Sequence, residues 1–170
     1  MHQSSQNPSN TNKVIWEWTA RIHSRKSECD STYNVILFLG AVPKNPEEWL
    51  TSPNLVGKHS VLISSYRTGG RGLDVTEGFV HLDNGIVKHS GLNSLEPNEV
   101  VPYLTRELDW RVQKIDGSIA HLDTLEVVVF ATPMTLPPGG MFPVPGRPHR
   151  YNSITYGRPG GSKEADDALE

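Results

Sequence analysis

The stretch from Glu77 to Trp110 constrains the fold most, because it is the one place where a pattern of strands is interrupted by helix. It predicts a strand from Val75 to Leu82, then a short polar helical turn, and then a helix that opens near Glu96. A further strand is predicted to begin at Asp109. The chain is therefore expected to be mainly β, with one or two short helices.

Two earlier stretches predict strands of different burial. Residues 14–23 (VIWEWTARIH) alternate apolar and polar side chains, which is typical of a strand with one buried face. The predicted apolar face carries Val14, Trp16, Trp18, Ala20 and Ile22, and the opposite face carries Ile15, Glu17, Thr19, Arg21 and His23. Residues 33–40 (YNVILFLG) are apolar on both faces, as expected of a strand that is buried on both sides.

Later segments complete a β pattern. Residues 55–65 (LVGKHSVLISS) predict a strand that, with a regular register, places together Leu55, His59, Val61 and Ile63. Asp116-Gly117 between apolar runs predicts a hairpin whose partner strand runs from Leu125 to Thr132. Several strands, mostly joined by hairpins, around one or two helices predict a β-sandwich or an open β-barrel.

The 170 residues suit one domain with a core of its own, which we expect to span residues 13–157. Residues 1–12 are polar and residues 158–170 are rich in glycine, serine and acids, so both are expected to be disordered tails. The six prolines from Pro133 to Pro148 predict an extended strap without regular structure. The Gly-rich segment 66–74 (YRTGGRGLD) has no helix after it and is predicted to be a linker rather than a phosphate-binding loop.

Charge and composition exclude several classes of partner. The formal net charge is −3 and no basic run occurs, which argues against nucleic acid. The longest apolar run, Val35 to Leu39, is far short of the roughly 20 residues that span a bilayer, and residues 1–12 lack the features of a secretory signal. The single cysteine, Cys29, allows no intramolecular disulfide and fits a reducing compartment, so a cytoplasmic protein is expected.

The chemically most informative group is His23, which shares a predicted strand face with Arg21 and Glu17. Together they offer a base that titrates near neutral pH, a fixed cation and an acid. The same three residues fit an exposed charged face equally well. Ser-His-Asp chemistry has no support, because the chain has no Gly-x-Ser-x-Gly sequence and Cys29 lies in a charged loop.

The remaining histidines and the aromatic residues have simpler interpretations. His81 and His89 have no cysteine or carboxylate at a standard ligand spacing, so no metal site is predicted. His59 is predicted to be a hydrogen-bonded histidine of the core. Four aromatic residues are predicted to belong first to the core, with some of them free to line a pocket for a flat ligand: Trp16, Trp18, Tyr33 and Phe38.

Several separated segments resemble the C-terminal domain of fungal, mushroom-type tyrosinases. They are VILFLGAVPKNPEEWLTSPNLVGKHSVL, EGFVHLDNGI, SLEPNEVVPYL and FPVPGRPHRYNSITYGRPGG, in the order of that domain, and the resemblance covers roughly Trp16 to Gly161. It implies a β-sandwich-like cap joined to a dicopper oxidase. In that family the cap covers the copper site of the latent enzyme by inserting an aromatic side chain, and its removal activates the oxidase.

Two features depart from that family. The chain holds no copper-binding catalytic domain, so it is not expected to act as a tyrosinase by itself. The family also commonly carries a Cys-x-x-Cys pair, linked to copper handling, in the loop before EGFVHL. Here that loop reads SSYRTGGRGLDVT and has no cysteine, so we expect the copper-handling function to be lost.

Two hypotheses follow, and the first is an enzyme. The freestanding cap would be an isomerase or cyclase without metal or cofactor that acts on a phenolic small molecule, for example by adding a phenol to an enone as in chalcone to flavanone. His23 would move the proton and Arg21 would stabilise the oxyanion, while Tyr33 or Glu17 would orient the histidine or the substrate. The predicted substrate-binding residues are Trp16, Trp18, Phe38, His81, His89 and Arg106.

The second hypothesis is that the domain acts in trans as a cap, chaperone or regulator of a separate tyrosinase-like oxidase. The enzyme is favoured because the polar, His-bearing strand face has no evident purpose in a plug. An enclosed cleft of roughly 300 Å³ or more, lined by Trp, Tyr and His23, would support the enzyme. An aromatic side chain standing out on a convex apolar patch would support the cap.

Overall fold

The computed structural model describes residues 13–64 and 74–170. The strands are β1 (Lys13–Arg25), β2 (Tyr33–Leu39), β3 (Leu55–Val61), β4 (Val75–His81), β5 (Leu108–Lys114), β6 (Glu126–Leu136), β7 (Val144–Pro145), β8 (His149–Tyr151) and β9 (Ala168–Leu169). The α-helices are α1 (Asp83–Ser90) and α2 (Pro97–Glu107), and short 3-10 helices span Lys26–Glu28, Pro46–Thr51 and Asn152–Ile154. The tail predicted at residues 1–12 and the linker up to residue 73 lie outside the described part of the chain.

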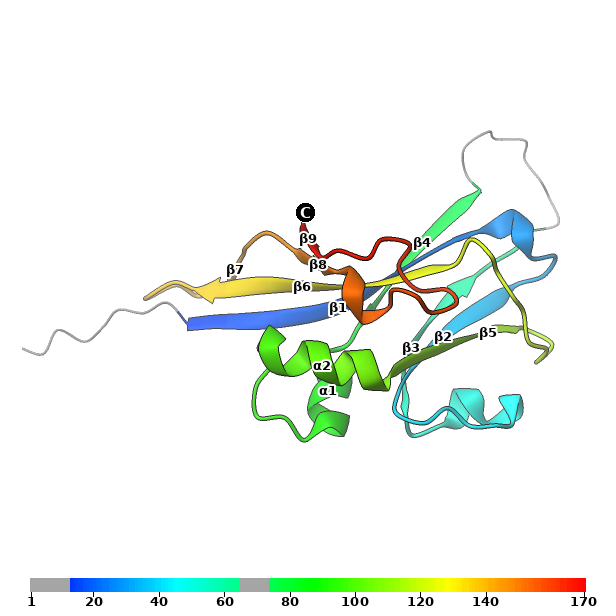
Figure 1. The fold of residues 1–170 in the computed structure, drawn as a ribbon, viewed down its shortest axis with the longest axis horizontal. Helices are drawn as coiled ribbons and strands as arrows, with labels where there is room; N and C mark the ends of the chain where they lie inside the picture. Colours follow the sequence, from blue (N-terminus) through cyan, green and yellow to red (C-terminus); the bar gives the residue numbers. More distant parts are fainter. Residues whose placement is uncertain (1–12, 65–73) are drawn as a thin grey trace, which may run out of the picture.

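The strands form two antiparallel sheets that face each other. The larger sheet has the order β4-β1-β6-β8-β9, with β7 paired to β6, and the smaller sheet has the order β3-β2-β5. The helices α1 and α2 lie on the same side of the larger sheet as the smaller sheet (Figure 1). The chain is thus mainly β, as predicted, and the strands described here close no barrel.

The strand β1 is central to the larger sheet, where it pairs with β4 on one side and with β6 on the other. The predicted alternation is confirmed, since Trp18, Ala20 and Ile22 are fully buried. Burial of β2 on both faces is confirmed as well. Its odd-numbered residues enter the main core, and its even-numbered residues Ile36 and Phe38 pack under Trp49 on the far side.

The register of β3 is not regular. The β2–β3 pairing shifts between Leu37 and Phe38, which leaves Val56 as the extra residue of a β-bulge. A one-residue shift exchanges the two faces of a strand. Leu55 therefore turns to the outer cluster instead of sharing a face with His59, and the prediction that grouped them is wrong for Leu55.

The Asp116-Gly117 turn forms, but its predicted partner strand is wrong. Gly117 has a φ of +92°, and the returning chain pairs with β5 only as far as Ala120, whose N–H donates to Val112 O at 3.0 Å. The strand β6 crosses instead to the larger sheet, between β1 and β8. Its run Val127–Val129 is fully buried on both faces, which suits the middle of a sheet rather than a position beside β5.

The proline-rich strap is more regular than predicted. Pro133 lies within β6, and its carbonyl accepts a hydrogen bond from Gly146 N–H at 2.7 Å. Proline lacks the N–H donor but keeps the acceptor, so a sheet can pass through it at such a position. The strand β7 then pairs back onto β6. Residues 133–146 form an arm, which projects beyond the helices (Figure 1).

The C-terminal residues 158–170, here called the clasp, are not the disordered tail that composition suggested. Gly160 O accepts a hydrogen bond from Val127 N–H at 2.7 Å, and Ser162 is only 4% exposed. The strand β9 adds to the edge of β8. Small and polar residues remain ordered here because the backbone of the clasp continues the hydrogen bonding of the larger sheet.

His59 lies where β3 meets β4 and is hydrogen-bonded as predicted, but it is half-buried at the margin of the core rather than within it. Its ring lies over Gly78, where an added Cβ would lie 2.2 Å from the histidine Nδ1. Its Nε2 lies 3.1 Å from the Thr76 hydroxyl. Burial lowers the pKa of His59 from its ordinary value of 6.5.

This lowered pKa predicts a pH dependence of stability. The unfolded chain binds a proton at His59 below about pH 6.5, whereas the folded chain binds this proton only at a lower pH. The stabilising effect is therefore full above that value and is lost as the pH falls through the lower folded pKa. Between about pH 7 and pH 5, the urea midpoint should fall more steeply for the unmodified chain than for His59→Gln. The exposed residue His121 supplies the control variant, His121→Gln. Equal slopes for the His59 variant and the unmodified chain would contradict the prediction.

Candidate functional site

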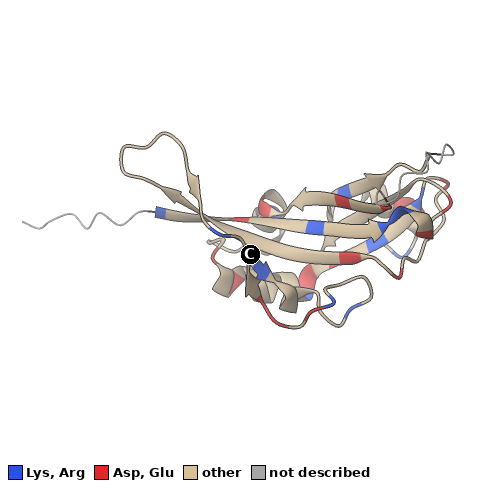
Figure 2. Ribbon diagram, turned by 90° about the horizontal axis from the view of Figure 1, so that it is seen from above, with Lys and Arg blue, Asp and Glu red and all other residues tan. Residues whose placement is uncertain are grey.

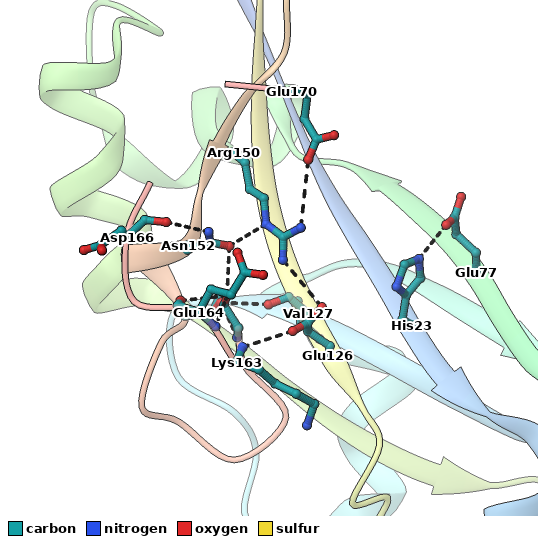
Figure 3. A network of polar contacts seen from close by, with 12 residues as sticks. His23, Glu77, Glu126, Val127, Arg150, Asn152, Lys163, Glu164, Asp166 and Glu170 are labelled. Carbon is teal, nitrogen blue, oxygen red and sulfur yellow. Dashed lines mark hydrogen bonds and ion pairs between the residues drawn. The ribbon is translucent and has the colours of Figure 1, made fainter. Parts of the chain in front are cut away.

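The three charged residues of the predicted catalytic group do lie on one face of β1, and this is the outer face of the larger sheet. His23 points toward Glu77 on β4, with Nε2 2.5 Å from the carboxylate Oε2 (Figure 3). Their side chains are 29% and 49% exposed, respectively. The histidine is thus paired across two strands in contact with solvent. Glu17 is exposed farther along the same strand.

The Arg21 side chain packs on the surface of the larger sheet and does not line the groove described below. Its guanidinium lies 4.8 Å from the centroid of the Phe130 ring on β6, a cation–π contact. Arg150 on β8 approaches the same ring at 5.9 Å and forms ion pairs with Glu126 and Glu170 (Figure 3). The outer face of the larger sheet is therefore a surface of paired charges, which was the plainer interpretation of its sequence.

Tyr33 is separated from this face. It belongs to β2 in the other sheet, it is fully buried, and its hydroxyl lies 2.7 Å from the Ser24 hydroxyl. Burial raises the pKa of Tyr33 above its ordinary value of 10.0. Because Ser24 is on the inner face of β1 and His23 on the outer face, Tyr33 cannot orient His23 as predicted.

The residues predicted to bind a substrate are not gathered either. Trp18 is fully buried, with its Nε1–H donating to Leu95 O at 2.8 Å, and Phe38 is fully buried in the separate cluster with Trp49. Trp16 is half-buried and meets His149 edge-on at 5.1 Å.

The polar members of that predicted set lie at the ends of three different elements. His81 closes β4, with Nδ1 3.5 Å from the Thr19 hydroxyl, His89 is in the last turn of α1, and Arg106 is in the last turn of α2. None of these three residues lines the groove described below, and none shares an element with His23. Within residues 13–64 and 74–170, no group of three or more His, Cys, Asp or Glu side chains is placed to hold a metal ion.

A groove of about 440 Å³ lies elsewhere, beside β5. It is formed by Asp109–Val112, by residues 119–123 with Leu125, and by Arg158–Gly160 of the clasp, so none of the predicted site residues lines it. Sequence reasoning missed it because its two arginines, Arg111 and Arg158, are far apart in the chain and belong to no motif.

The arm carries the two large apolar side chains that are most exposed to solvent among the described residues. Met141 is 85% exposed and Phe142 is 76% exposed. Leu136 and Val144 of the arm are also exposed, as are Val14 and Ile15 on the adjacent strand β1. The arm carries no charged residue (Figure 2). An exposed apolar patch of this kind is typical of an interaction surface. The sequence signal was available in PPGGMFPVPG, where two large apolar residues are enclosed by residues that build no core.

No helix within the described residues is long and apolar enough to cross a membrane.

Comparison with known proteins gives a consistent set of relatives. A family model described as the tyrosinase C-terminal domain matches residues 17–129. A tyrosinase of Neurospora crassa is 29% identical over 164 residues, which cover 88% of this chain and 24% of that protein. Polyphenol oxidase 4 of Agaricus bisporus is 30% identical over 140 residues, which cover 79% of this chain and 22% of that protein.

Solved structures agree with the sequence matches. The structure of recombinant mushroom tyrosinase superposes with a TM-score of 0.63 at 28% identity, covering 81% of this chain and 24% of that one. A crystal structure holding latent and active mushroom tyrosinase gives a TM-score of 0.62 at 26% identity, covering 82% of this chain and 25% of that one. The chain spans about a quarter of the length of the relatives that it matches.

Proposed function

Because the chain belongs to the tyrosinase C-terminal domain family, we propose that it packs on a tyrosinase-like catalytic domain and shields the active site of that domain. The observation that carries this proposal is the family match over residues 17–129, together with the shared fold of mushroom tyrosinase. The relatives are a tyrosinase and a polyphenol oxidase, each about four times longer than the matched region. The domain would act on such a catalytic domain as a cap, chaperone or regulator.

The arm supports this role. Phe142 is an aromatic side chain that stands out on an apolar projection, which is the feature expected of a cap rather than of an enzyme. Burial of Met141 and Phe142 against a partner would remove both from water. Each buried side chain of this size is worth about 1.5–3 kcal/mol before the costs of association are counted.

The isomerase hypothesis receives less support from the geometry. His23 is paired with Glu77 on an outer face, Tyr33 is enclosed in the core, and neither of them lines the groove beside β5. Glu17, Arg21 and His23 share the outer face of β1, but Tyr33 is separated from them in the core. On the polar face of β1 that favoured an enzyme, His23 forms an ion pair with Glu77 and Arg21 contacts the Phe130 ring.

The proposal is tested by mixing the purified chain with the catalytic part of a fungal tyrosinase from which the C-terminal part has been removed. A complex should appear in size-exclusion chromatography with light scattering, and phenol oxidation should fall as the chain is added. Phe142→Ala should weaken the complex by about tenfold, or about 1.4 kcal/mol, because it removes an anchor of the apolar contact.

Phe79→Ala is the matched control, because Phe79 is also an exposed phenylalanine, 57% accessible, but lies on the outer face of β4. It should leave binding and inhibition unchanged. No complex and no inhibition with the unmodified chain would overturn the shielding role itself. Equal losses in the two variants would overturn only the assignment of the arm as the contact surface.

A further inference from the structure

The groove beside β5 is built at an open edge of the smaller sheet. β5 pairs with β2 on one side, and on the other side only its last residues pair, with the chain that returns through Ser118 and Ala120. At Leu108 and Trp110 side chains take the place of a neighbouring strand. Arg158 Nη1 donates to Leu108 O at 2.6 Å, and Arg111 Nη1 donates to Trp110 O at 2.7 Å.

These bonds fix two guanidinium groups at one end of the groove. Both also contact the same carboxylate oxygen, Asp109 Oδ1, at 2.8 Å from Arg111 and 3.1 Å from Arg158. Two cations share one anion in this cluster, so one of the two positive charges has no anionic partner there, although the Asp123 carboxylate also lines the groove. The two arginine side chains are 39% and 33% exposed, so solvent and solutes reach them.

The guanidinium groups keep unused hydrogen-bond donors. A guanidinium has five N–H groups in a fixed planar fork, and the bonds named above use two from Arg111 and two from Arg158. The remaining N–H groups match the geometry of a carboxylate, which accepts such bonds in pairs. Within the described residues no second carboxylate pairs with either arginine.

The rest of the groove is lined by apolar residues together with His121 and Asp123. Leu122 and Leu125 contribute buried walls, and Ile119 is 51% exposed at the mouth. The face of the Trp110 ring is already covered, because the Arg158 guanidinium lies 4.3 Å from its centroid. Gly160 keeps the clasp close to this ring, since a Cβ there would lie 2.7 Å from the Trp110 Nε1.

We propose that this groove is a binding site for a small organic monocarboxylate with an apolar body. The carboxylate bridges Arg111 and Arg158, and the apolar body lies along Ile119 and Leu122. A volume of about 440 Å³ is in the range of small-molecule sites. The site is independent of the arm and of the shielding role, because its residues come from β5, the returning chain and the clasp.

The indole N–H of Trp110 is a direct reporter, because it donates to Pro159 O at 3.1 Å at the floor of the groove. We expect sodium benzoate to produce a saturable shift of this signal in two-dimensional NMR of the full chain, with the signal assigned through Trp110→Phe. Benzyl alcohol lacks the charge and inorganic phosphate lacks the apolar body, so each should bind at least about tenfold more weakly than benzoate.

Arg158→Gln and Arg111→Gln should each weaken benzoate binding by about tenfold or more, because each removes one half of the carboxylate clamp. Arg106→Gln is the control, since Arg106 is exposed on α2 and does not line the groove. The comparison of the three probes on the unmodified chain remains decisive if an arginine variant fails to fold. A shift that does not saturate, or that benzyl alcohol or phosphate reproduces at the same concentration, would overturn the site and leave the arginines as caps of the β5 edge.

Discussion

Removal of residues 158–170 is expected to lower the free energy of unfolding by at least about 5 kcal/mol, which is the whole stability of many small domains. The clasp supplies hydrogen-bond partners to buried groups of the domain. Asn152 is fully buried, and its side chain accepts from the Ser162 hydroxyl at 2.8 Å and donates to Asp166 O at 2.6 Å. Truncation would remove both partners.

Two further groups would lose their acceptors. The Val127 N–H donates to Gly160 O, and the Trp110 indole N–H donates to Pro159 O. Each buried polar group that is left without a partner costs about 1–3 kcal/mol. Together with the loss of Asn152 bonding, these costs reach the expected total. The measurement is urea unfolding followed by circular dichroism and tryptophan fluorescence.

A shorter truncation provides the control. Removal of residues 168–170 deletes β9, the Arg150–Glu170 ion pair at 3.9 Å and the bonds of Glu170 to Arg147 and Pro148, all at the edge of the sheet, so it should cost far less than removal of the whole clasp. Gly161→Ala is the matched point variant, because its Cβ would lie 1.9 Å from the backbone oxygen of Thr155. It should reproduce much of the loss. Full stability of the chain that ends at Gly157 would show that the clasp is not part of the folding unit.

The strands were predictable wherever local pattern decides structure. The alternation in residues 14–23 and the apolar run of residues 33–39 each correspond to a strand with the predicted faces. The helices α1 and α2 also lie between two strands as expected. Alternation and capping residues act over a few neighbours, so one sequence suffices to read them.

Pairing between distant segments was not predictable in the same way. Nothing near Leu125 shows that β6 joins β1 rather than β5, because the choice depends on which sheet can bury both faces of Val127–Val129. The clasp is composed of small and polar residues, and its order comes from bonds to Asn152 and Val127. Composition describes the tail alone and contains no information on those partners.

The candidate site shows the same limit. The common face of Glu17, Arg21 and His23 was predicted correctly, but the periodicity of a strand does not say whether its polar face meets a hollow or solvent. Tyr33 was assigned to that group although it lies in the other sheet. The groove arginines, Arg111 and Arg158, come together only because the clasp folds back along β5.

Trp18→Ala is expected to destabilise the chain by about 3–5 kcal/mol, as is usual for the loss of a large aromatic residue from a core. Trp18 is fully buried, and its ring stacks on Tyr151 at 5.4 Å with an interplanar angle of 28°. Its Nε1–H bond to Leu95 O ties the segment between α1 and α2 to β1. A substrate-binding tryptophan in an open pocket would cost far less to remove.

Trp18→Phe separates the contributions of packing and hydrogen bonding. It keeps most of the apolar ring but leaves Leu95 O without its donor, so the loss should be about half of that seen for alanine, or about 2 kcal/mol. Trp16→Ala is the matched comparison, since Trp16 is half-buried on the same strand face and should cost less than Trp18→Ala. Unfolding of Trp18→Ala at the same urea concentration as the unmodified chain would contradict the burial of Trp18. It would also contradict the packing of the segment between α1 and α2 against β1. Trp18→Ala is therefore expected to cost more than either Trp18→Phe or Trp16→Ala, an order that follows from burial and from the bond to Leu95 O and needs no ligand.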